Sequence, residues 1–196
     1  MNSIFSYVVA FDSGFAPNPF GGFLTLATCK PKIRSVAASG DWLLGLGSVR
    51  TVGSARVVFA AQVSEVIPLE LYGSLSEFAK KRPGRRGSSR CGDNIYYLGG
   101  NGRFCQRENP FHPLSEMAHD LSGMNALVCN DYWYFGSSAP PLPPRLAQLY
   151  KKGRGHGRSR DARVLADLRR WIHRKEAGVH GKPWHDEVLE RGCPAV

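Results

Sequence analysis

The fold is decided by Gly40-Asp41-Trp42-Leu43-Leu44-Gly45-Leu46-Gly47-Ser48 and, a short interval later, by Val57-Val58-Phe59-Ala60-Ala61-Gln62-Val63. Both are apolar runs of strand length, and the Gly-Asp pair before the first is a tight-turn signal. The second run belongs to a longer apolar stretch over residues 55–67, which predicts a strand that bends midway. Glycines inside an apolar strand indicate that another part of the chain approaches the backbone closely.

Similar runs on both sides extend this pattern. The sequence predicts further strands at residues 7–11, 23–27, 93–98 and 124–129. It predicts a helical turn at 33–38 and a helix at 71–81. Alternating parallel β-α-β units are not evident, so the expected fold class is α+β, with helices inserted into an antiparallel, barrel-like sheet.

Four consecutive aromatic residues occur at Tyr132-Trp133-Tyr134-Phe135. Side chains along a strand point alternately to its two faces. These four rings therefore cannot all lie on one face, and we expect one pair to face away from the other.

The chain of 196 residues carries a formal net charge of +10, and the excess is clustered at residues 80–86 and 151–175. Clustered positive charge favours a polyanionic partner such as DNA, because cations near phosphates release counterions. Within the second cluster, Val164, Leu165, Leu168, Trp171 and Ile172 have helical spacing, which predicts a basic amphipathic helix. We therefore expect a body over residues 1–150 and a basic helical extension over 151–196 packed on it.

The five cysteines are widely spaced and include no Cys-x-x-Cys pair. Cys91 and Cys105 with His112 and His119 also fit no standard metal-ligand spacing, so we expect neither a metal nor a cofactor. Reduced thiols are typical of cytoplasmic proteins, which is the expected location. No apolar run approaches the twenty residues of a membrane helix, so no membrane contact is expected.

Residues 12–22 form an unusual loop, Asp12-Ser13-Gly14-Phe15-Ala16-Pro17-Asn18-Pro19-Phe20-Gly21-Gly22. Glycine and proline fix special backbone angles, and Asp and Asn place polar groups near the main chain. Residues 28–34 then add a thiol, two lysines and an arginine. Both segments are interpreted as presenting groups to a ligand.

Two resemblances follow from these residues. Gly40 to Ser48 with Val57 to Val63 resembles the core of PUA-like domains of the EVE and ASCH branches. Five segments together resemble the nucleotide modification associated domain family, second type: Asp12 to Phe20, Cys29 to Arg34, Gly40 to Trp42, Tyr134 to Gly136, and Gly153 to His156. That family is placed among bacterial and phage systems that modify DNA bases. The resemblance implies a process, base modification or recognition of modified nucleic acid, and no particular reaction.

In an EVE-like site, aromatic rings stack on a base and polar groups read its edge. The candidates for binding the base are Asn18, Trp42, Trp133, Tyr134 and Phe135. The candidates for binding phosphate are Lys32, Arg34, Arg85, Arg86, Arg154 and His156. The candidates for catalysis are Asp12, Cys29 and Lys30, where neighbouring cations would lower the pKa of the Cys29 thiol and Asp12 or His112 would act as base. Structural alternatives stand beside these roles: a core position for Trp42 or Phe135, a turn for Asn18, a cap for Asp12 and an inert thiol for Cys29.

Three functions are consistent with these features. The first is a nucleic-acid-binding module that recognises a modified or flipped base in DNA. The second is an enzyme that acts on a nucleotide or DNA base through Asp12, Cys29 and Lys30. The third is an interaction subunit of a DNA-modification complex, whose basic helix binds a partner protein.

Overall fold

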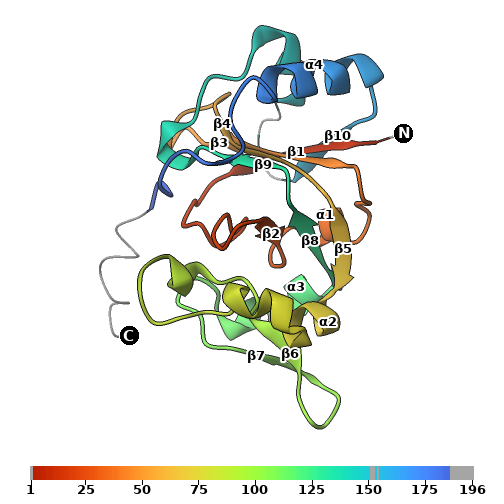
Figure 1. Cartoon of the computed structure of the whole chain (residues 1–196), viewed down its shortest axis with the longest axis vertical. Helices are drawn as coiled ribbons and strands as arrows, with labels where there is room; N and C mark the ends of the chain where they lie inside the picture. The colour runs from red at the N-terminus through yellow and green to blue at the C-terminus, as the bar shows by residue number, and fades with distance from the viewer. Residues whose placement is uncertain (1, 151–152, 154, 186–196) are drawn as a thin grey trace.

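The computed structural model describes residues 2–150, 153 and 155–185, and its fold is a mixed α+β arrangement with several sheets (Figure 1). The largest sheet has six strands in the order β10 (His156–Ser159), β1 (Ile4–Val9), β3 (Trp42–Gly47), β4 (Val57–Gln62), β9 (Tyr132–Tyr134) and β11 (Gly178–Val179). β1 pairs with β3 in parallel, and β11 pairs with β9 in parallel. The other neighbours are antiparallel.

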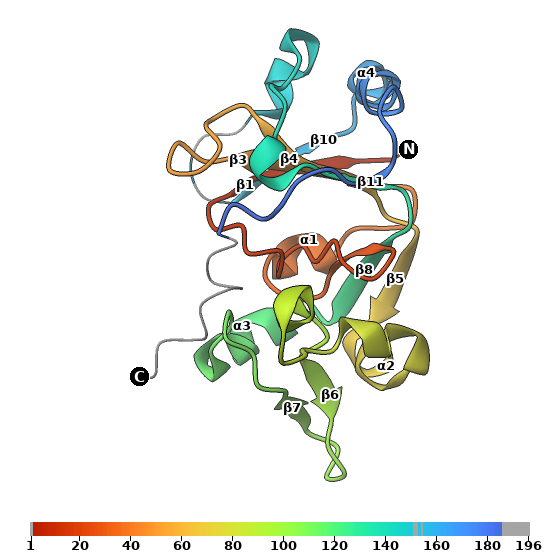
Figure 2. The ribbon, with the colours of Figure 1, turned by 60° about the vertical axis from the view of Figure 1, so that its left-hand side comes forward.

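A second sheet has the order β2 (Leu24–Leu26), β8 (Asn125–Cys129) and β5 (Glu65–Pro68), and β6 (Tyr96–Leu98) pairs with β7 (Phe104–Gln106) as a hairpin. Figure 2 shows β5 and β8 descending from the large sheet toward this hairpin. The predicted bend in residues 55–67 occurs after Gln62, where the chain leaves β4 and enters β5 in another sheet.

None of the described sheets closes into a barrel, so the predicted PUA-like barrel is not confirmed. The physical reason is the bend after Gln62, which divides one long apolar stretch between two sheets instead of carrying a single sheet around to meet its own edge.

Among the described residues, the helices other than α4 (Ala162–Ile172) are short. The others are α1 (Pro31–Arg34), α2 (Leu69–Ser74) and α3 (Met117–Leu121), with 3₁₀ segments at Ser76–Lys81, Gly87–Cys91, Leu114–Glu116, Gly136–Ser138 and Pro144–Leu149. The helix expected over 71–81 is divided, because Leu75 is extended between α2 and the 3₁₀ segment. The Ser74 hydroxyl donates to the carbonyl of Leu71, a local bond that competes with helix continuation. No helix in the described residues is long and apolar enough to cross a membrane.

The two faces of the large sheet carry different clusters of core side chains. Tyr132 and Tyr134 lie in one cluster, and Trp133 and Phe135 lie in the other, so the predicted alternation of the aromatic run is confirmed. The predicted close approach at the strand glycines is confirmed as well. A Cβ on Gly45 would lie 2.1 Å from the Phe59 ring, so only glycine fits there.

Helix α4 covers the second of these faces (Figures 1 and 2). Its buried residues Val164, Leu168 and Ile172 join the cluster that contains Trp133 and Phe135. α4 is not the final element, since β11 follows it and adds an edge strand to the large sheet beside β9.

Candidate functional site

A cavity of about 1090 Å³ lies where the ends of β1 and β3 meet α1 and α3. Cys29, Lys30 and Lys32 reach it from the segment at α1, and His156 reaches it from the start of β10. Four residues that were expected to bind a ligand or to take part in catalysis therefore line one cavity, although they come from segments that are far apart in the sequence. The other polar residues that line the cavity are Ser48, Ser54, Glu116, His119, Asp120 and Tyr150.

The wall residues Cys29 and Lys30 form a strained turn. Their φ angles are 55° and 43°, in the left-handed region that residues with side chains rarely occupy. The carbonyl of Lys30 accepts the backbone N–H groups of Ile33 and Arg34 at 2.9 and 3.1 Å, which starts α1. Backbone strain of this kind costs on the order of 1–3 kcal/mol and persists only where surrounding contacts impose it.

Those contacts come from Arg34, which is completely buried beneath the turn. Its Nε donates to the carbonyl of Cys29 at 2.7 Å, Nη1 to the carbonyl of Asn125 at 2.7 Å, and Nη2 to the carbonyl of Asp120 at 2.5 Å. Burial lowers the pKa of the guanidinium. Arg34 therefore does not face the cavity as the expected phosphate ligand, because its donors are turned inward to hold the Cys29–Lys30 turn.

Asp120 completes the support of the turn. One carboxylate oxygen accepts the backbone N–H of Cys29 at 2.7 Å and lies 3.9 Å from Nη2 of Arg34. The other accepts the hydroxyl of Tyr96 at 3.0 Å and lies 2.6 Å from Nε2 of His112. The carboxylate is fully buried, so it positions the cavity wall from behind.

The Cys29 thiol is not activated in this setting. Burial, with a smaller contribution from the negative charge of Asp120, raises its pKa to about 11. Lys30 and Arg34 act in the opposite direction but do not outweigh these effects. The predicted lowering of the Cys29 pKa by neighbouring cations is therefore wrong, because desolvation disfavours the thiolate more strongly than the cations favour it.

Lys30 is half-buried on the wall, and its Nζ lies 4.8 Å from the centre of the Tyr7 ring. Lys32 is exposed at the first turn of α1. His156 is half-buried and packs edge-on against Phe5, with 5.9 Å between the ring centres. These side chains place cationic and imidazole nitrogens at one cavity.

Asp12 is not among the residues that line the cavity. Its carboxylate accepts the hydroxyl of Tyr134 at 2.6 Å and the backbone N–H of Trp184 at 3.2 Å, and its own N–H donates to Nδ1 of His185 at 3.1 Å. Burial raises the pKa of Asp12, and these hydrogen bonds partly oppose the rise. The carboxylate thus joins β9 to residues 184–185 and is separate from the Cys29–Lys30 turn.

The side-chain amide of Asn18 also makes its hydrogen bonds inside the protein. Its Nδ2 donates to the carbonyl of Cys91 at 2.5 Å, and its Oδ1 accepts the N–H of Phe20 at 3.2 Å and the ammonium of Lys81 at 2.9 Å. The side chain is 2% exposed. The amide that was expected to read a base edge instead fixes the loop of residues 12–22.

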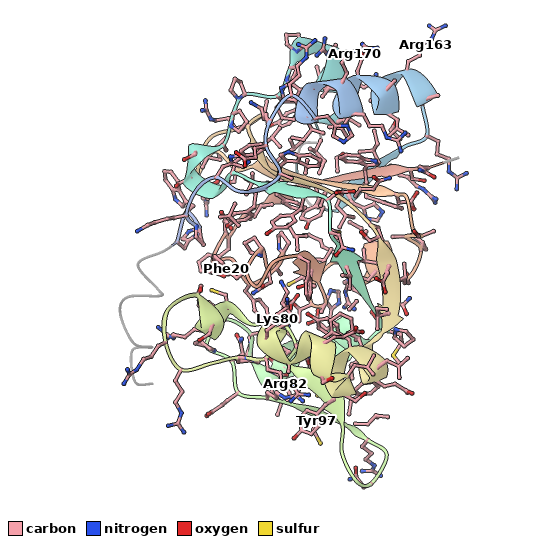
Figure 3. The ribbon with its side chains drawn as sticks, viewed as in Figure 1. Phe20, Lys80, Arg82, Tyr97, Arg163 and Arg170 are labelled. Carbon is pink, nitrogen blue, oxygen red and sulfur yellow. The ribbon has the colours of Figure 1, made fainter. Side chains whose placement is uncertain are left out.

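Lys81 is the unexpected centre of that loop. Its buried ammonium also donates to the carbonyls of Asn18, Phe20 and Phe23 at 3.1, 2.5 and 2.6 Å. Burial lowers its pKa to about 8. The side chain comes from a segment that reads as part of a solvated basic cluster, and nothing in the sequence marks it as different from exposed Lys80 beside it (Figure 3).

The aromatic residues proposed to stack on a base are core residues. Trp42 and Tyr134 are 0% exposed, and Trp133 and Phe135 are 4% exposed. Trp42 stacks on Trp133 beneath α4, and Tyr134 donates to Asp12. They were expected to bind a base because they are large and aromatic, which is equally the property that fills a core.

The remaining phosphate candidates lie elsewhere. Arg85 and Arg86 are exposed in the loop between the two 3₁₀ segments that follow α2, and neither lines the cavity. Arg154 lies outside the described residues. Among the described residues, no group of three His, Cys, Asp or Glu side chains is placed to hold a metal ion.

Sequence reasoning missed Glu116, His119, Asp120 and Tyr150 on the cavity wall. Glu116 and His119 are exposed, and both belong to the turn that leads into α3 or to α3 itself. Tyr150 follows the 3₁₀ segment after the proline-rich stretch. The short spacing of Glu116, His119 and Asp120 over one helical turn was the available signal, since it places their side chains on adjacent positions of one surface.

Comparison with known proteins agrees with the resemblance seen in the sequence. Searches of curated proteins and of solved structures gave no match. The sequence model described as nucleotide modification associated domain 2 matches residues 1–190, nearly the whole chain. The chain therefore belongs to the nucleotide modification associated domain 2 family.

Proposed function

We propose that this protein binds one nucleotide unit of DNA, with a modified or flipped base, in the cavity formed by the Cys29–Lys30 turn, α3 and the start of β10. The observation that carries the proposal is the convergence of Lys30, Lys32 and His156 on a single cavity from segments more than a hundred residues apart. Family membership supplies the context, which is nucleotide modification.

The dimensions and chemistry of the cavity support a nucleotide. A volume of about 1090 Å³ is just above the range for small-molecule sites, which is roughly 300–1,000 Å³, so a nucleotide unit can enter it. Lys30 and Lys32 supply positive charge for a phosphate. Gly155 beside His156 leaves the backbone open for close approach of an anion.

The base would be held by groups other than those first expected. Tyr150 is a half-buried aromatic residue on the wall, and His156 is a second half-buried ring. Stacking contributes about 1–3 kcal/mol per base and accepts any base, so polar neighbours must discriminate. Glu116 and His119 on α3 are the polar groups in position to do so.

Binding of single-stranded DNA at several salt concentrations tests the proposal. Fluorescence anisotropy would compare the wild type with Lys30→Gln, and with Arg103→Gln as a charge-matched control. Arg103 is exposed in the loop between β6 and β7 and does not line the cavity. Figure 1 shows this hairpin at the lower end of the molecule. We expect a steep loss of affinity with salt, and a slope of log K against log salt that Lys30→Gln lowers by about 0.7.

The Arg103→Gln control should retain the wild-type slope. Equal behaviour of the two variants would contradict the cavity as the binding site. Absence of DNA binding even at low salt would contradict the proposal and favour an interaction subunit of a modification complex. Repeating the titration with a modified base in the oligonucleotide measures whether the cavity discriminates bases.

A catalytic function at Cys29 is the second candidate, because the thiol lies on the cavity wall. It is the weaker one, since burial raises the thiol pKa to about 11 and Asp12 lies outside the cavity lining. Incubation with modified and unmodified nucleotides, followed by mass spectrometry, would detect a reaction. A mass change that is lost in Cys29→Ala would favour the enzyme.

A further inference from the structure

A second, smaller hollow lies between α2 and the β6–β7 hairpin. Its volume is about 320 Å³, and its wall includes Glu70, Gly73, Ser74, Arg82, Tyr97 and Arg107. Figure 3 shows Arg82 and Tyr97 close to one another below α2. None of these residues lines the large cavity, so the hollow is a separate feature.

Arg107 is held rigidly in this hollow. Its Nη1 donates to the carbonyl and the Oδ1 of Asn94, both at 3.1 Å, and its Nη2 donates to the carbonyl of Gly73 at 3.1 Å. The guanidinium lies over the Tyr97 ring, 4.4 Å from its centre. Three hydrogen bonds and a stacked ring fix the plane of the guanidinium.

Arg82 converges on the same point. Its Nη2 lies 3.4 Å from the carbonyls of Gly73 and Ser74, so both arginines contact the carbonyl of Gly73. The Nε of Arg82 is buried and has no hydrogen-bond partner among the described residues. The protein therefore leaves part of the hydrogen-bonding capacity of the Arg82 guanidinium unused.

The two guanidiniums lack a counterion. Within the described residues, no carboxylate lies within 4.0 Å of either arginine. Burial, and then the positive charge of Arg82, lower the pKa of Arg107. The protein therefore holds two like charges together without compensating them, an arrangement that an anion would stabilise.

We propose that Arg82 and Arg107 form a second binding site, whose ligand is a phosphate group. Nη1 of Arg82 and Nε of Arg107 donate to no acceptor among the described residues, and guanidinium N–H groups match the geometry of phosphate oxygens. The small hollow fits a phosphate monoester end better than a whole nucleotide. The ligand is either free phosphate or the terminal phosphate of a nucleic acid, and these share the same chemistry.

Glu70 lines the same hollow and provides a further test of the proposal. Its carboxylate is exposed at the first turn of α2, and it would repel a phosphate dianion. Neutralising it in Glu70→Gln should raise phosphate affinity. A site that bound a cation would respond in the opposite way.

The test is an NMR titration of the full chain with inorganic phosphate, followed through the arginine Nε–H resonances. We expect the Arg82 resonance to shift and saturate, while the Arg103 resonance changes little. Arg82→Gln should weaken the binding at this site at least tenfold, and Glu70→Gln should strengthen it at least threefold. An Arg82 resonance that does not saturate, or that moves in parallel with Arg103, would overturn the proposal.

If Arg82→Gln does not fold, the proposal can still be tested with Glu70→Gln. An unchanged phosphate affinity in Glu70→Gln would also overturn the proposal. Titration with a 5′-phosphorylated and a 5′-hydroxyl oligonucleotide identifies the source of the phosphate. A shift of the Arg82 resonance with the phosphorylated strand alone, lost in Arg82→Gln, assigns a nucleic-acid end, and a shift with inorganic phosphate but with neither strand assigns a free phosphate. Lys30→Gln should leave the Arg82 response unchanged, so failure here is distinct from failure at the large cavity.

Discussion

The loop of residues 12–22 and the turn at Cys29–Lys30 are both organised around a buried cation, and they use it differently. In the loop, Lys81 donates to three main-chain carbonyls and to the Asn18 amide, and the loop's polar groups face inward. In the turn, Arg34 and Asp120 hold the backbone from behind, and the Cys29 and Lys30 side chains line the large cavity.

The difference shows how two segments of similar composition serve separate purposes. A loop whose polar groups are all satisfied internally has little left to offer a ligand. In a turn whose backbone is held in a strained conformation from the protein interior, the side chains can line the cavity. Residues 12–22 thus have a structural role, and we propose residues 29–32 as the ligand-binding segment.

Replacement of Arg34 should have the largest effect. Arg34→Gln removes a fully buried guanidinium and leaves the Asp120 carboxylate and three carbonyls short of donors. We expect the free energy of unfolding to fall by about 3–5 kcal/mol. Urea denaturation measures it, and a loss below about 1 kcal/mol would contradict the role of Arg34 as the support of the turn.

Replacement of Lys81 should be the next largest. Lys81→Met keeps the approximate length of the side chain but leaves the carbonyls of Phe20 and Phe23 without a donor, while the Asn18 carbonyl keeps the N–H of Thr25. We expect a loss of about 2–4 kcal/mol in the free energy of unfolding. Lys80→Met is the matched control, since Lys80 is the exposed neighbour, and it should change stability by less than about 0.5 kcal/mol.

Lys81 should also make stability depend on pH. Its pKa is lowered to about 8 in the folded protein, from 10.5 for an unperturbed lysine. Between these values the unfolded chain binds more protons, so the free energy of unfolding rises with pH relative to Lys81→Met. Denaturation curves of both proteins from pH 7 to pH 10 measure the difference, and a difference that falls with pH would contradict the lowered pKa.

The Cys29 thiol should react slowly. With a pKa of about 11, roughly one molecule in a thousand carries the thiolate at pH 8. Alkylation by iodoacetamide, followed by mass spectrometry of the peptide that contains Cys29, should be much slower than for a free cysteine peptide and should accelerate as the pH rises toward 11. Rapid alkylation at pH 7 would contradict the raised pKa and revive the catalytic hypothesis.

Much of the fold could be predicted from local pattern. The apolar runs around Trp42, Phe59 and Leu127 became strands, and the alternating aromatic run divided between two faces, because periodicity depends only on neighbouring residues. Closure of a sheet depends instead on which distant strands pair. The bend after Gln62 was visible in the sequence, but its consequence, two sheets in place of a barrel, was not.

The candidate site was predicted only in part. Cys29, Lys30, Lys32 and His156 line one cavity, whereas Arg34, Asn18 and Asp12 are turned into the protein. The sequence does not distinguish a buried arginine or lysine from an exposed one. Whether such a side chain is buried depends on distant segments that pack over it. Asp120 and Asn125, which hold Arg34, are about ninety residues away along the chain.

The assignment of the two segments is tested most directly by backbone amide NMR during titration with a single-stranded oligonucleotide. We expect saturating shifts at Cys29, Lys30 and Lys32, at Gly155 and His156, and at Glu116 and His119 on α3. We expect little change at residues 18–23, where Lys81 holds the loop internally. Shifts concentrated in residues 12–22, with none at Cys29–Lys32, would contradict this assignment.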